Sequence, residues 1–516
     1  MSGQRNAVVS GAIAMTLAIF VVKVIGVLYK IPLSYLLGDE GMGYFNAAYT
    51  VYGFFYIISS AGVPKAVTMV IASGNSVSES NAQSFTKKLL ISFGFIGVAV
   101  TLIFIVLSSP ISALIGNSKA AATMLGIAPS IFFVAEAGVL RGYLNGESKL
   151  LPIAVSQVIE ALSKLILGLI FAYLGLQLGL TLSMISALTV LGITLGSFFS
   201  LLYLYLTVFR KKNCVEKCTD HSYKGKFKQV IKIAIPITLS SSIIAISNVL
   251  DIGMIQNGLT ASGYTAGEAT ALYGSYSTLA LPMLTLITSL LTPVTAALLP
   301  KLVSAHNLND TEAFNTSLNT AWKITVLIAI PAALIYYLYA FELLDLLFAS
   351  SSTVNAFECL ILLAPSAILL PLLNIVNTAL ESKGKLFESL ISLLFGIAVK
   401  IIVSIILVGK SGIGIIGAAI GTSFSYLFSL CMSLIFMSSD KSVKLNVLEA
   451  LPDLVISLIL YVPPFVLIYA VNLCSNSVLS LLLALFLPTA IYLPIAYRSL
   501  KHKGIILSKH HNAQKK

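Results

Sequence analysis

Long apolar stretches separated by short polar loops run through nearly the whole chain. A helix that crosses a bilayer needs about 20 mainly apolar residues. Fourteen segments meet this criterion, near 7–30, 42–64, 89–108, 121–140, 152–174, 181–208, 232–256, 270–299, 324–341, 355–379, 388–408, 413–437, 452–472 and 478–497. The pattern therefore predicts an all-α integral membrane protein with about 14 transmembrane helices.

A block of this pattern recurs 236 residues later in the chain. Identical residues return at this spacing: Pro64-Lys65 and Pro300-Lys301, Ala128-Pro129-Ser130 and Ala364-Pro365-Ser366, Lys149 and Lys385, and Lys164 and Lys400. The offset spans six of the predicted helices, an even number, so both copies enter the membrane in the same direction. The chain is thus predicted to be a parallel tandem duplication.

The duplication predicts four regions. Residues 1–209 form an N-lobe of helices 1–6, 210–231 a basic cytoplasmic linker, and 232–438 a C-lobe of helices 7–12. Residues 439–516 hold helices 13 and 14 and a basic tail. Two related lobes that rock against each other can expose a central site to each side of a membrane in turn. Transport is therefore the first functional expectation.

Composition agrees with a membrane location and assigns an orientation. The chain is 57% hydrophobic and 10% charged, with a mean hydropathy of +0.96, which leaves too little polar surface for a water-soluble globule. Lysine and arginine collect in alternate loops, which predicts cytoplasmic N- and C-termini. The net charge of +12 lies beside helix ends, where topology and anionic headgroups account for it. Nucleic acid is accordingly not an expected partner.

A few charged residues fall inside the apolar segments, where a charge facing lipid is costly. Ser156, Glu160 and Lys164 are four residues apart and share one helix face. Lys164 follows Pro152 by twelve residues, roughly 18 Å of helix, which places it near the middle of the bilayer. Because Lys400 is its repeat, the two lysines are candidates to line a cavity that attracts a phosphate or diphosphate. The alternative is that they are structural ion-pair partners, with Glu160 pairing Lys164 within its own helix.

Other polar residues extend this candidate site. Lys23 in the first helix and Arg141 at the cytoplasmic entrance complete a cationic set with Lys164 and Lys400. Three acids, Glu136, Glu160 and Asp251, are candidates either for coupling to a cation or proton or for neutralising a lysine. No other cofactor is expected.

Enzyme chemistry finds little support in the sequence. There is no phosphate-binding loop of P-loop spacing and no His-Glu-x-x-His motif. Cys214, Cys218 and His221 could supply three metal ligands, but their spacing is loose and a fourth is not evident, so a solvated basic loop is the preferred interpretation. Neither an enzyme nor a metal site is expected.

Two stretches resemble a known family. KVIGVLYKIPLSYLLGDEGMGYFNAAYTVY at 23–52, with ISSAGVPKAV at 58–67, is similar to the opening of the stage V sporulation protein B group of polysaccharide-type flippases. RGYLNGESKLLPIAVSQVIEALSK at 141–164 resembles the same group. The resemblance implies a bundle of two lobes around a cationic cavity, with Lys23, Arg141, Glu160 and Lys164 at family-like positions. It also implies a bacterial plasma membrane and an undecaprenyl-pyrophosphate-linked saccharide as cargo.

Three functional hypotheses follow. The first is an alternating-access flippase that moves lipid II, or a related precursor of the cell wall or of a polysaccharide, from the inner to the outer leaflet. Its partners would be the lipid-linked oligosaccharide, membrane lipids and the cell-wall synthesis machinery, in growth or in sporulation. The second is a cation-coupled multidrug exporter of the same superfamily, whose cavity should favour carboxylates and aromatic rings. The third is a non-transporting scaffold for envelope assembly.

Overall fold

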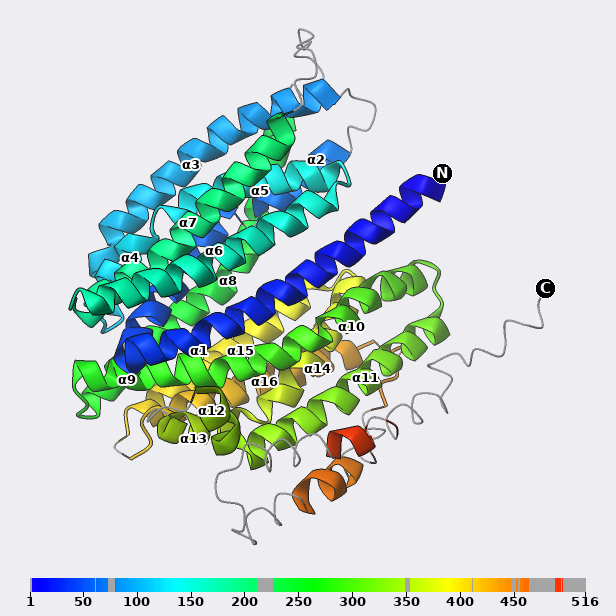
Figure 1. The fold of residues 1–516 in the computed structure, drawn as a ribbon. Helices are drawn as coiled ribbons and strands as arrows, with labels where there is room; N and C mark the ends of the chain where they lie inside the picture. Colours follow the sequence, from blue (N-terminus) through cyan, green and yellow to red (C-terminus); the bar gives the residue numbers. More distant parts are fainter. Residues whose placement is uncertain are drawn as a thin grey trace. The chain divides into compact units, whose positions relative to one another are not determined.

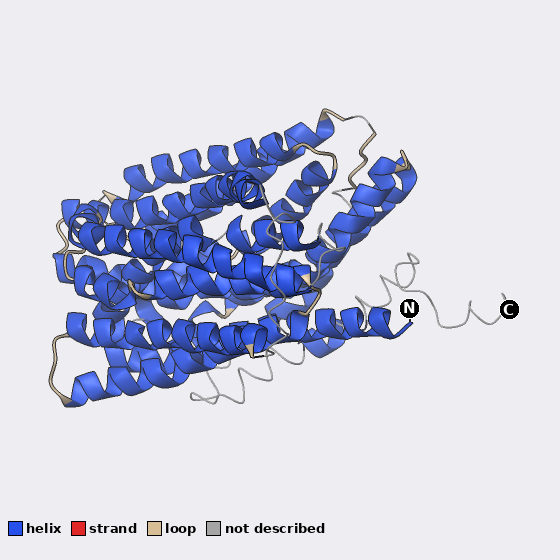
Figure 2. Cartoon of the chain, turned by 90° about the horizontal axis from the view of Figure 1, so that it is seen from above, coloured by secondary structure: helices blue, strands red, loops and turns tan. Residues whose placement is uncertain are grey.

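The computed structural model shows a helical protein (Figures 1 and 2). It describes residues 2–60, 62–72, 79–210, 226–348, 353–410, 412–440, 442–446, 452, 455–463, 488–492 and 494. Every regular element in these ranges is a helix. Ten helices are long and apolar enough to cross a membrane, or eleven if the bent pair Ala356–Leu363 and Ser366–Ser382 counts as one span. The all-α membrane fold is therefore confirmed, whereas the total of 14 helices stays a prediction.

The chain divides into two compact units, Met1–Gly274 and Ser275–Lys516, and each is described here by itself. The first unit contains α1 Ser2–Ser60, α2 Gly62–Ala72, α3 Glu79–Leu114, α4 Ala120–Ile127, α5 Ser130–Gly146, α6 Leu150–Gln177, α7 Leu182–Phe209, α8 Lys226–Ala261 and, at the boundary, α9 Ala266–Ser275. The second contains η1 Tyr276–Ala280, α10 Leu281–Asn307, α11 Thr311–Leu338, α12 Ala340–Phe348, α13 Thr353–Leu363, α14 Ser366–Ser382, α15 Leu386–Val408 and α16 Ile416–Ser438.

The unit boundary lies beyond the linker that the repeat predicts. Helix α8, expected to open the C-lobe, packs against α1 and α2 of unit 1. The contact is close because the backbone amide of Gly62 donates to Thr238 Oγ1 at 3.2 Å, and a Cβ at Gly62 would meet the Ala234 carbonyl oxygen at 2.2 Å. Linker residues 211–225 and most of predicted helices 13 and 14 lie outside the described residues. The four-region division by duplication remains a prediction.

The long helix α1 holds two of the predicted spans. A straight helix of its 59 residues would measure about 90 Å, three times the hydrocarbon thickness of a bilayer, about 30 Å. The run is broken at Gly38, whose φ of 62° and ψ of −175° are non-helical. Glycine suits this position because a side chain is disfavoured at positive φ. The break separates the predicted spans 7–30 and 42–64.

Helix boundaries repeat at the same offset as the sequence. Helices α5 and α14 begin at Ser130 and Ser366, 236 residues apart, and α6 and α15 begin at Leu150 and Leu386. The turns before α6 and α15 also match, since Ser148 and Gly384 both have positive φ, 58° and 76°. The local structure therefore agrees with an internal duplication of these elements.

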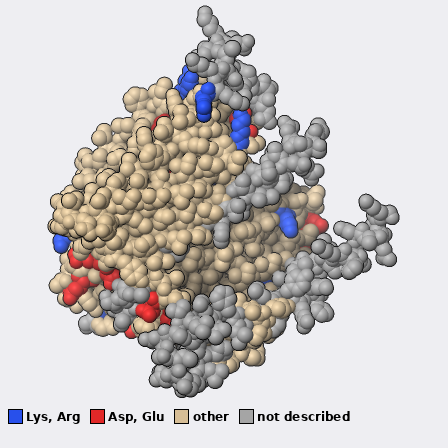
Figure 3. Space-filling view, in the orientation of Figure 1, with Lys and Arg blue, Asp and Glu red and all other residues tan. Residues whose placement is uncertain are grey.

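The surface of the bundle suits a hydrocarbon environment. Charged side chains are few on the face shown in Figure 3. Helix α3 carries large apolar side chains with little cover, such as Phe95 at 74% and Val106 at 73% exposure. Contiguous apolar surface of this kind is rare in soluble proteins but expected where lipid is the solvent.

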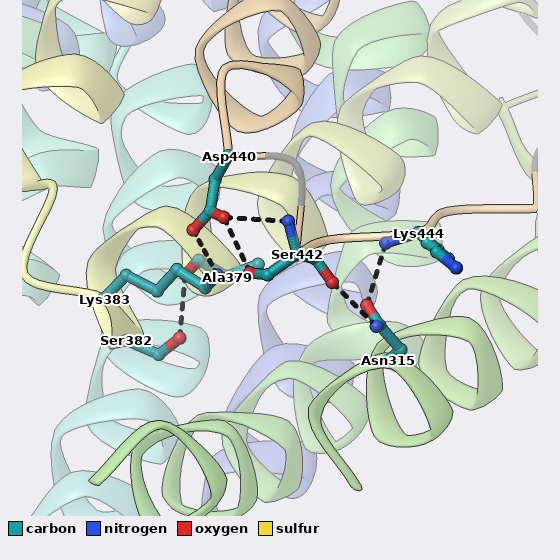
Figure 4. A network of polar contacts seen from close by, with 7 residues as sticks. All are labelled: Asn315, Ala379, Ser382, Lys383, Asp440, Ser442 and Lys444. Atoms are coloured by element: carbon teal, nitrogen blue, oxygen red, sulfur yellow. Dashed lines mark hydrogen bonds and ion pairs between the residues drawn. The ribbon is translucent and has the colours of Figure 1, made fainter. Parts of the chain in front are cut away.

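In unit 2 a polar network ties together the ends of three helices (Figure 4). Lys383, the C-cap of α14, lies 2.6 Å from the Asp440 carboxylate and 4.6 Å from the centroid of the Phe314 ring of α11. After α16, residues 442–446 have no regular secondary structure and contact α11. The Asn315 side chain donates to the Ser442 carbonyl at 2.9 Å and accepts from the Lys444 amide at 2.9 Å. The network therefore joins α11, α14 and α16 at one end.

Candidate functional site

A cavity of about 430 Å³ lies within unit 1. Both halves of α1 line it, on either side of the break at Gly38, together with α5, α6 and α7. The lining residues are Ile19, Val22, Ile25, Gly26, Tyr29, Tyr49, Tyr52, Gly53, Tyr56, Arg141, Gln157, Glu160, Ala161, Lys164 and Ile193. The mixture of apolar walls with a few convergent polar groups is typical of a ligand site.

One wall of the cavity is held by an ion pair between helices. Arg141 of α5 places Nη2 2.8 Å from Glu160 Oε2 of α6. The same nitrogen donates to Ser200 Oγ of α7 at 2.9 Å, and Arg141 Nε donates to Ser156 Oγ at 3.2 Å. The pair is partly buried, with side-chain exposures of 15% for Arg141 and 29% for Glu160. Because both charges are paired and hydrogen-bonded, the desolvation cost of burying them is largely offset.

Lys164 has aromatic neighbours rather than a carboxylate. Its Nζ atom lies 5.2 Å from the centroid of the Tyr29 ring and 4.6 Å from that of Tyr49. Ring faces attract a cation by about 0.5–2 kcal/mol, depending on desolvation, without neutralising it. Lys30 of α1 is near enough for its charge to interact with that of Lys164. Among the described residues, no carboxylate is paired with Lys164 at this end of the cavity.

Tyrosine side chains form a second wall. Tyr49, Tyr52 and Tyr56 follow one face of α1, with neighbouring ring centroids 5.9 Å apart in each case. Phe45 extends the row by stacking on Tyr49 at 6.0 Å. The spacing of three and four residues places these rings in line along the helix. The row presents apolar ring faces and hydroxyl groups together, which suits a ligand with both characters.

Glycines allow α6 and α7 to approach closely behind these walls. A Cβ at Gly192 would lie 2.4 Å from the Gly168 amide nitrogen, and one at Gly196 would lie 2.8 Å from the Glu160 carbonyl oxygen. Side chains at these positions would force the helices apart. Small residues at such contacts are the usual way in which membrane helices pack tightly, and here they fix the backbone that carries Glu160 and Lys164.

The structure brings only part of the predicted cationic set together. Arg141 of α5 and Lys164 of α6 line the cavity together with Glu160 of α6, but the partner of Glu160 is Arg141 rather than Lys164. The pairing within one helix that the sequence left open as an alternative is thus replaced by a pairing between two helices. Lys23 lies on the same helix as the tyrosines but outside the described lining, and Lys400 belongs to unit 2.

The other candidates lie away from the cavity. Glu136 of α5 is buried against α3, and Asp251 is buried in α8. No cluster of three His, Cys, Asp or Glu side chains suited to a metal occurs in the part of the chain that the structure describes. Cys214, Cys218 and His221 lie outside that part. The tyrosine row was missed by the sequence interpretation, although the spacing of Tyr49, Tyr52 and Tyr56 was a signal for it.

Comparisons with known proteins agree with a multi-pass helical transport fold. The family described as "Polysaccharide biosynthesis protein" matches residues 8–306. Stage V sporulation protein B of Bacillus subtilis is 24% identical over 425 residues, covering 81% of this chain and 80% of that protein. The lipid II flippase MurJ of the same organism is 23% identical over 521 residues, covering 95% and 94%.

A solved structure shares the architecture. The lipid II flippase MurJ in an inward closed conformation superposes with a TM-score of 0.71, at 19% identity, over 95% of this chain and 99% of that chain. A likeness at this identity shows a common fold. The chain is therefore a multi-pass membrane protein of the fold found in MurJ. It belongs to the polysaccharide biosynthesis protein family, as its resemblance to the stage V sporulation protein B group predicted.

Proposed function

We propose that the chain is an alternating-access flippase that moves an undecaprenyl-pyrophosphate-linked saccharide, lipid II or a related envelope precursor, to the outer leaflet of a bacterial plasma membrane. The single observation that carries the proposal is the charge of the cavity in unit 1. Its lining holds two cations, Arg141 and Lys164, and one anion, Glu160, which is already engaged by Arg141. A positive charge remains for a ligand.

The arrangement suits a sugar diphosphate. A lysine ammonium is a compact point charge that binds phosphate oxygens, and in a cavity with low-dielectric walls its field is focused on the ligand. The tyrosine faces beside it can pack on the apolar faces of sugar rings, while the tyrosine hydroxyls and Gln157 supply hydrogen bonds. The polyprenyl chain needs no polar site because it can stay in lipid. Lys23 and Lys400 are included in the proposal as further contacts for the cargo.

A multidrug exporter remains the second candidate. Aromatic rings such as Tyr49 and Tyr52 also attract organic cations. An organic cation would, however, enter beside Lys164, and like charges at close range in a weakly hydrated cavity repel strongly. The cavity therefore favours an anionic cargo. A non-transporting scaffold would not require the positive charge at all, so loss of function on removal of Lys164 separates the flippase from the scaffold.

The test is complementation in bacteria whose own lipid II flippase can be shut off. Accessible lipid II at the outer leaflet is measured with the wild-type chain and with Lys164→Ala, Lys164→Arg and Lys149→Ala. We expect the wild-type chain to restore access, Lys164→Ala to reduce it at least about tenfold because a charge contact in such a site contributes more than 1.4 kcal/mol, and Lys164→Arg to retain part of it.

The matched control is Lys149→Ala, which removes a lysine from the N-cap of the same helix, outside the cavity. It should behave as wild type. Failure of the inserted wild-type chain to restore access excludes lipid II and directs the search to other lipid-linked glycans. Restoration that Lys164→Ala leaves intact would instead show that the cavity of unit 1 does not bind the cargo.

A further inference from the structure

A second ionisable group lies in the membrane interior, outside the cavity. Glu136 of α5 is 9% exposed, and it lies ten residues, about 15 Å of helix, from Gly146 at the end of α5. Its Oε1 atom is buried and has no hydrogen-bond partner among the described residues. Nor does Glu136 form an ion pair within those residues. A polar atom in this position calls for an explanation.

The Glu136 carboxyl faces a seam of small residues on α3. A Cβ at Gly94 would lie 2.9 Å from Glu136 Oε1. One turn further on, a Cβ at Gly97 would lie 3.3 Å from the Ala135 Cβ atom and 3.3 Å from the Phe132 Cα atom. The helices therefore meet closely at the carboxyl and one turn beyond it. On its other side α3 exposes apolar side chains such as Phe95, so the surroundings are hydrocarbon rather than water.

Among the residues that the structure describes, no charged side chain pairs with the Glu136 carboxyl. The helices that pack against α5 are α1, α2, α3, α6 and α7, and α7 has no ionisable side chains except Tyr203 and Tyr205. The charged side chains that the structure describes on the other four are Lys23, Lys30, Asp39 and Glu40 on α1, Lys65 on α2, Lys87 and Lys88 on α3, and Glu160 and Lys164 on α6. None of them forms an ion pair or hydrogen bond with Glu136, and Arg141 of α5 itself pairs with Glu160.

The Glu136 carboxyl can therefore be either ionised or protonated at this depth, and the two forms differ greatly in free energy. An unpaired carboxylate at this depth costs several kcal/mol, whereas the neutral acid costs far less. We infer that Glu136 is a proton-binding site in the membrane interior, and that its bound proton holds α3 against α5 at the Gly94 seam. When the proton leaves, the charge must recruit water or a counter-ion, and the two helices separate. The device is independent of the identity of the cargo.

Cysteine cross-linking tests the helix contact. The five native cysteines are replaced by alanine, and Gly97→Cys and Ala135→Cys are introduced together, since these Cβ positions lie near the separation of a disulfide. The rate of oxidation is measured in membranes from acidic to alkaline pH, with Glu136 and with Glu136→Gln. The ratio of the two rates removes the pH dependence of thiol chemistry itself.

We expect equal rates at acidic pH. At alkaline pH the Glu136 protein should cross-link at least about tenfold more slowly than Glu136→Gln, because the neutral amide keeps the contact and the carboxylate opens it. A ratio that is constant with pH overturns the inference. Absence of cross-linking in both proteins at every pH also overturns it, because the contact on which it depends would not exist.

Infrared spectroscopy provides a readout that needs no new cysteines. At neutral pH the difference between wild type and Glu136→Gln should contain the C=O stretch of a protonated carboxyl, and this band should disappear at alkaline pH. The control is Glu147→Gln, at the C-cap of α5, because the Glu147 carboxylate, unlike that of Glu136, has an ion-pair partner, Lys149 at 3.8 Å. No protonated-carboxyl band in the Glu136 difference at neutral pH contradicts proton binding there.

Discussion

Helices α5, α6 and α7 of unit 1 and helices α14, α15 and α16 of unit 2 can be compared position by position at the repeat offset. In unit 1 Arg141 and Glu160 form an ion pair at 2.8 Å. Asn377 and Gly396 occupy the corresponding positions in unit 2. There the Asn377 side chain accepts a hydrogen bond from Ser433 Oγ at 2.8 Å. A charged pair in one unit is matched by a neutral contact in the other.

The difference shows that the two charges behave as one feature. Loss of the acid alone would leave Arg141 charged and unpaired in a poorly hydrated wall, at a cost of several kcal/mol, whereas loss of both is tolerated. Lysine, by contrast, is present in both units, as Lys164 and Lys400. Because the lysine persists where the acid is absent, it is not explained by pairing with that acid. This supports a role for Lys164 in binding rather than in packing.

The packing behind these residues also differs. In unit 2 a Cβ at Gly396 would lie 1.8 Å from Ser429 Oγ and 2.6 Å from the Ser425 carbonyl oxygen. In unit 1 the small residue is on the opposite helix, at Gly196. At this point of the helix pair, the glycine that permits close approach lies on α15 in unit 2 and on α7 in unit 1. The glycine on α15 leaves no room for an acid like Glu160.

The largest effect is expected when the charged pair of unit 1 is broken on one side. Glu160→Ala should lower the free energy of unfolding by about 2–3 kcal/mol, less than the 3–5 kcal/mol of a fully buried pair because Glu160 is 29% exposed. Arg141→Asn with Glu160→Gly, which installs the residues of unit 2, should recover most of that loss. Titration with SDS in mixed micelles measures both. Equal destabilisation by the single and double changes would show that the charges are not coupled.

A smaller effect is expected from a methyl group at the tight contact of unit 2. Gly396→Ala should destabilise by about 2 kcal/mol, since overpacking forces backbone shifts, and adding Ser429→Gly should restore part of it. Gly53→Ala is the control, because a Cβ there meets nothing within 4 Å and should not destabilise. Titration with SDS in mixed micelles measures these changes in stability as well. A neutral Gly396→Ala would mean that α15 and α16 are not in close contact at this point.

The broad architecture of both units could be predicted from the sequence because it depends on long local patterns of apolar residues. Apolar runs of about 20 residues predict membrane-spanning helices without knowledge of the helices that pack beside them. The repeat offset of 236 residues likewise predicts the equivalent starts of α5 and α14. The stripe of Ser156, Glu160 and Lys164 also located the polar face of α6. These inferences needed no knowledge of which helices touch.

The partners within the site could not be read in the same way. Glu160 and Lys164 are one turn apart, and their spacing left a pairing between them open as an alternative, but Arg141, nineteen residues from Glu160, reaches it from α5. The length of the arginine side chain and the close approach of α7 at Gly196 decide this contact. Both follow from helix packing, which a single sequence does not specify.

Unit 2 has a segment without regular secondary structure after α16, and its anchoring gives the next prediction. The Asn319 side chain donates to the Lys444 carbonyl at 2.8 Å and accepts from the Asn446 amide at 2.9 Å. Asn319→Ala should cost about 1–2 kcal/mol locally, because two backbone groups lose their partners, and hydrogen exchange should accelerate at Asn446. Asn374→Ala, with an exposed side chain, should leave that exchange unchanged. Unaltered exchange in Asn319→Ala would contradict the anchoring.

The smallest predicted change in stability concerns the C-terminal ends of α5 and α14, which occupy equivalent positions in the repeat. The C-cap of α5 is Glu147 and that of α14 is Lys383, and a cation is the favourable charge at a helix C-terminus. Hydrogen bonds from Lys383 and Ser442 hold the pKa of the Asp440 carboxyl below its usual range. Because the folded pKa lies below the unfolded value, this network stabilises unit 2 above about pH 4, and the stabilisation is lost as the pH falls through the folded pKa.

The partial exposure of Asp440, 32%, limits this contribution to about 1 kcal/mol. Stability measured against pH in wild type and in Lys383→Ala should therefore converge in acid and differ at neutral pH. Glu147→Ala is the matched change at the equivalent helix end, where the ion pair of Glu147 is 3.8 Å long and its lysine is 46% exposed, so that little stability depends on it. Parallel curves for wild type and Lys383→Ala would show that Lys383 does not set the ionisation of Asp440. In that case the two helix ends would differ in their residues but not in their energetics.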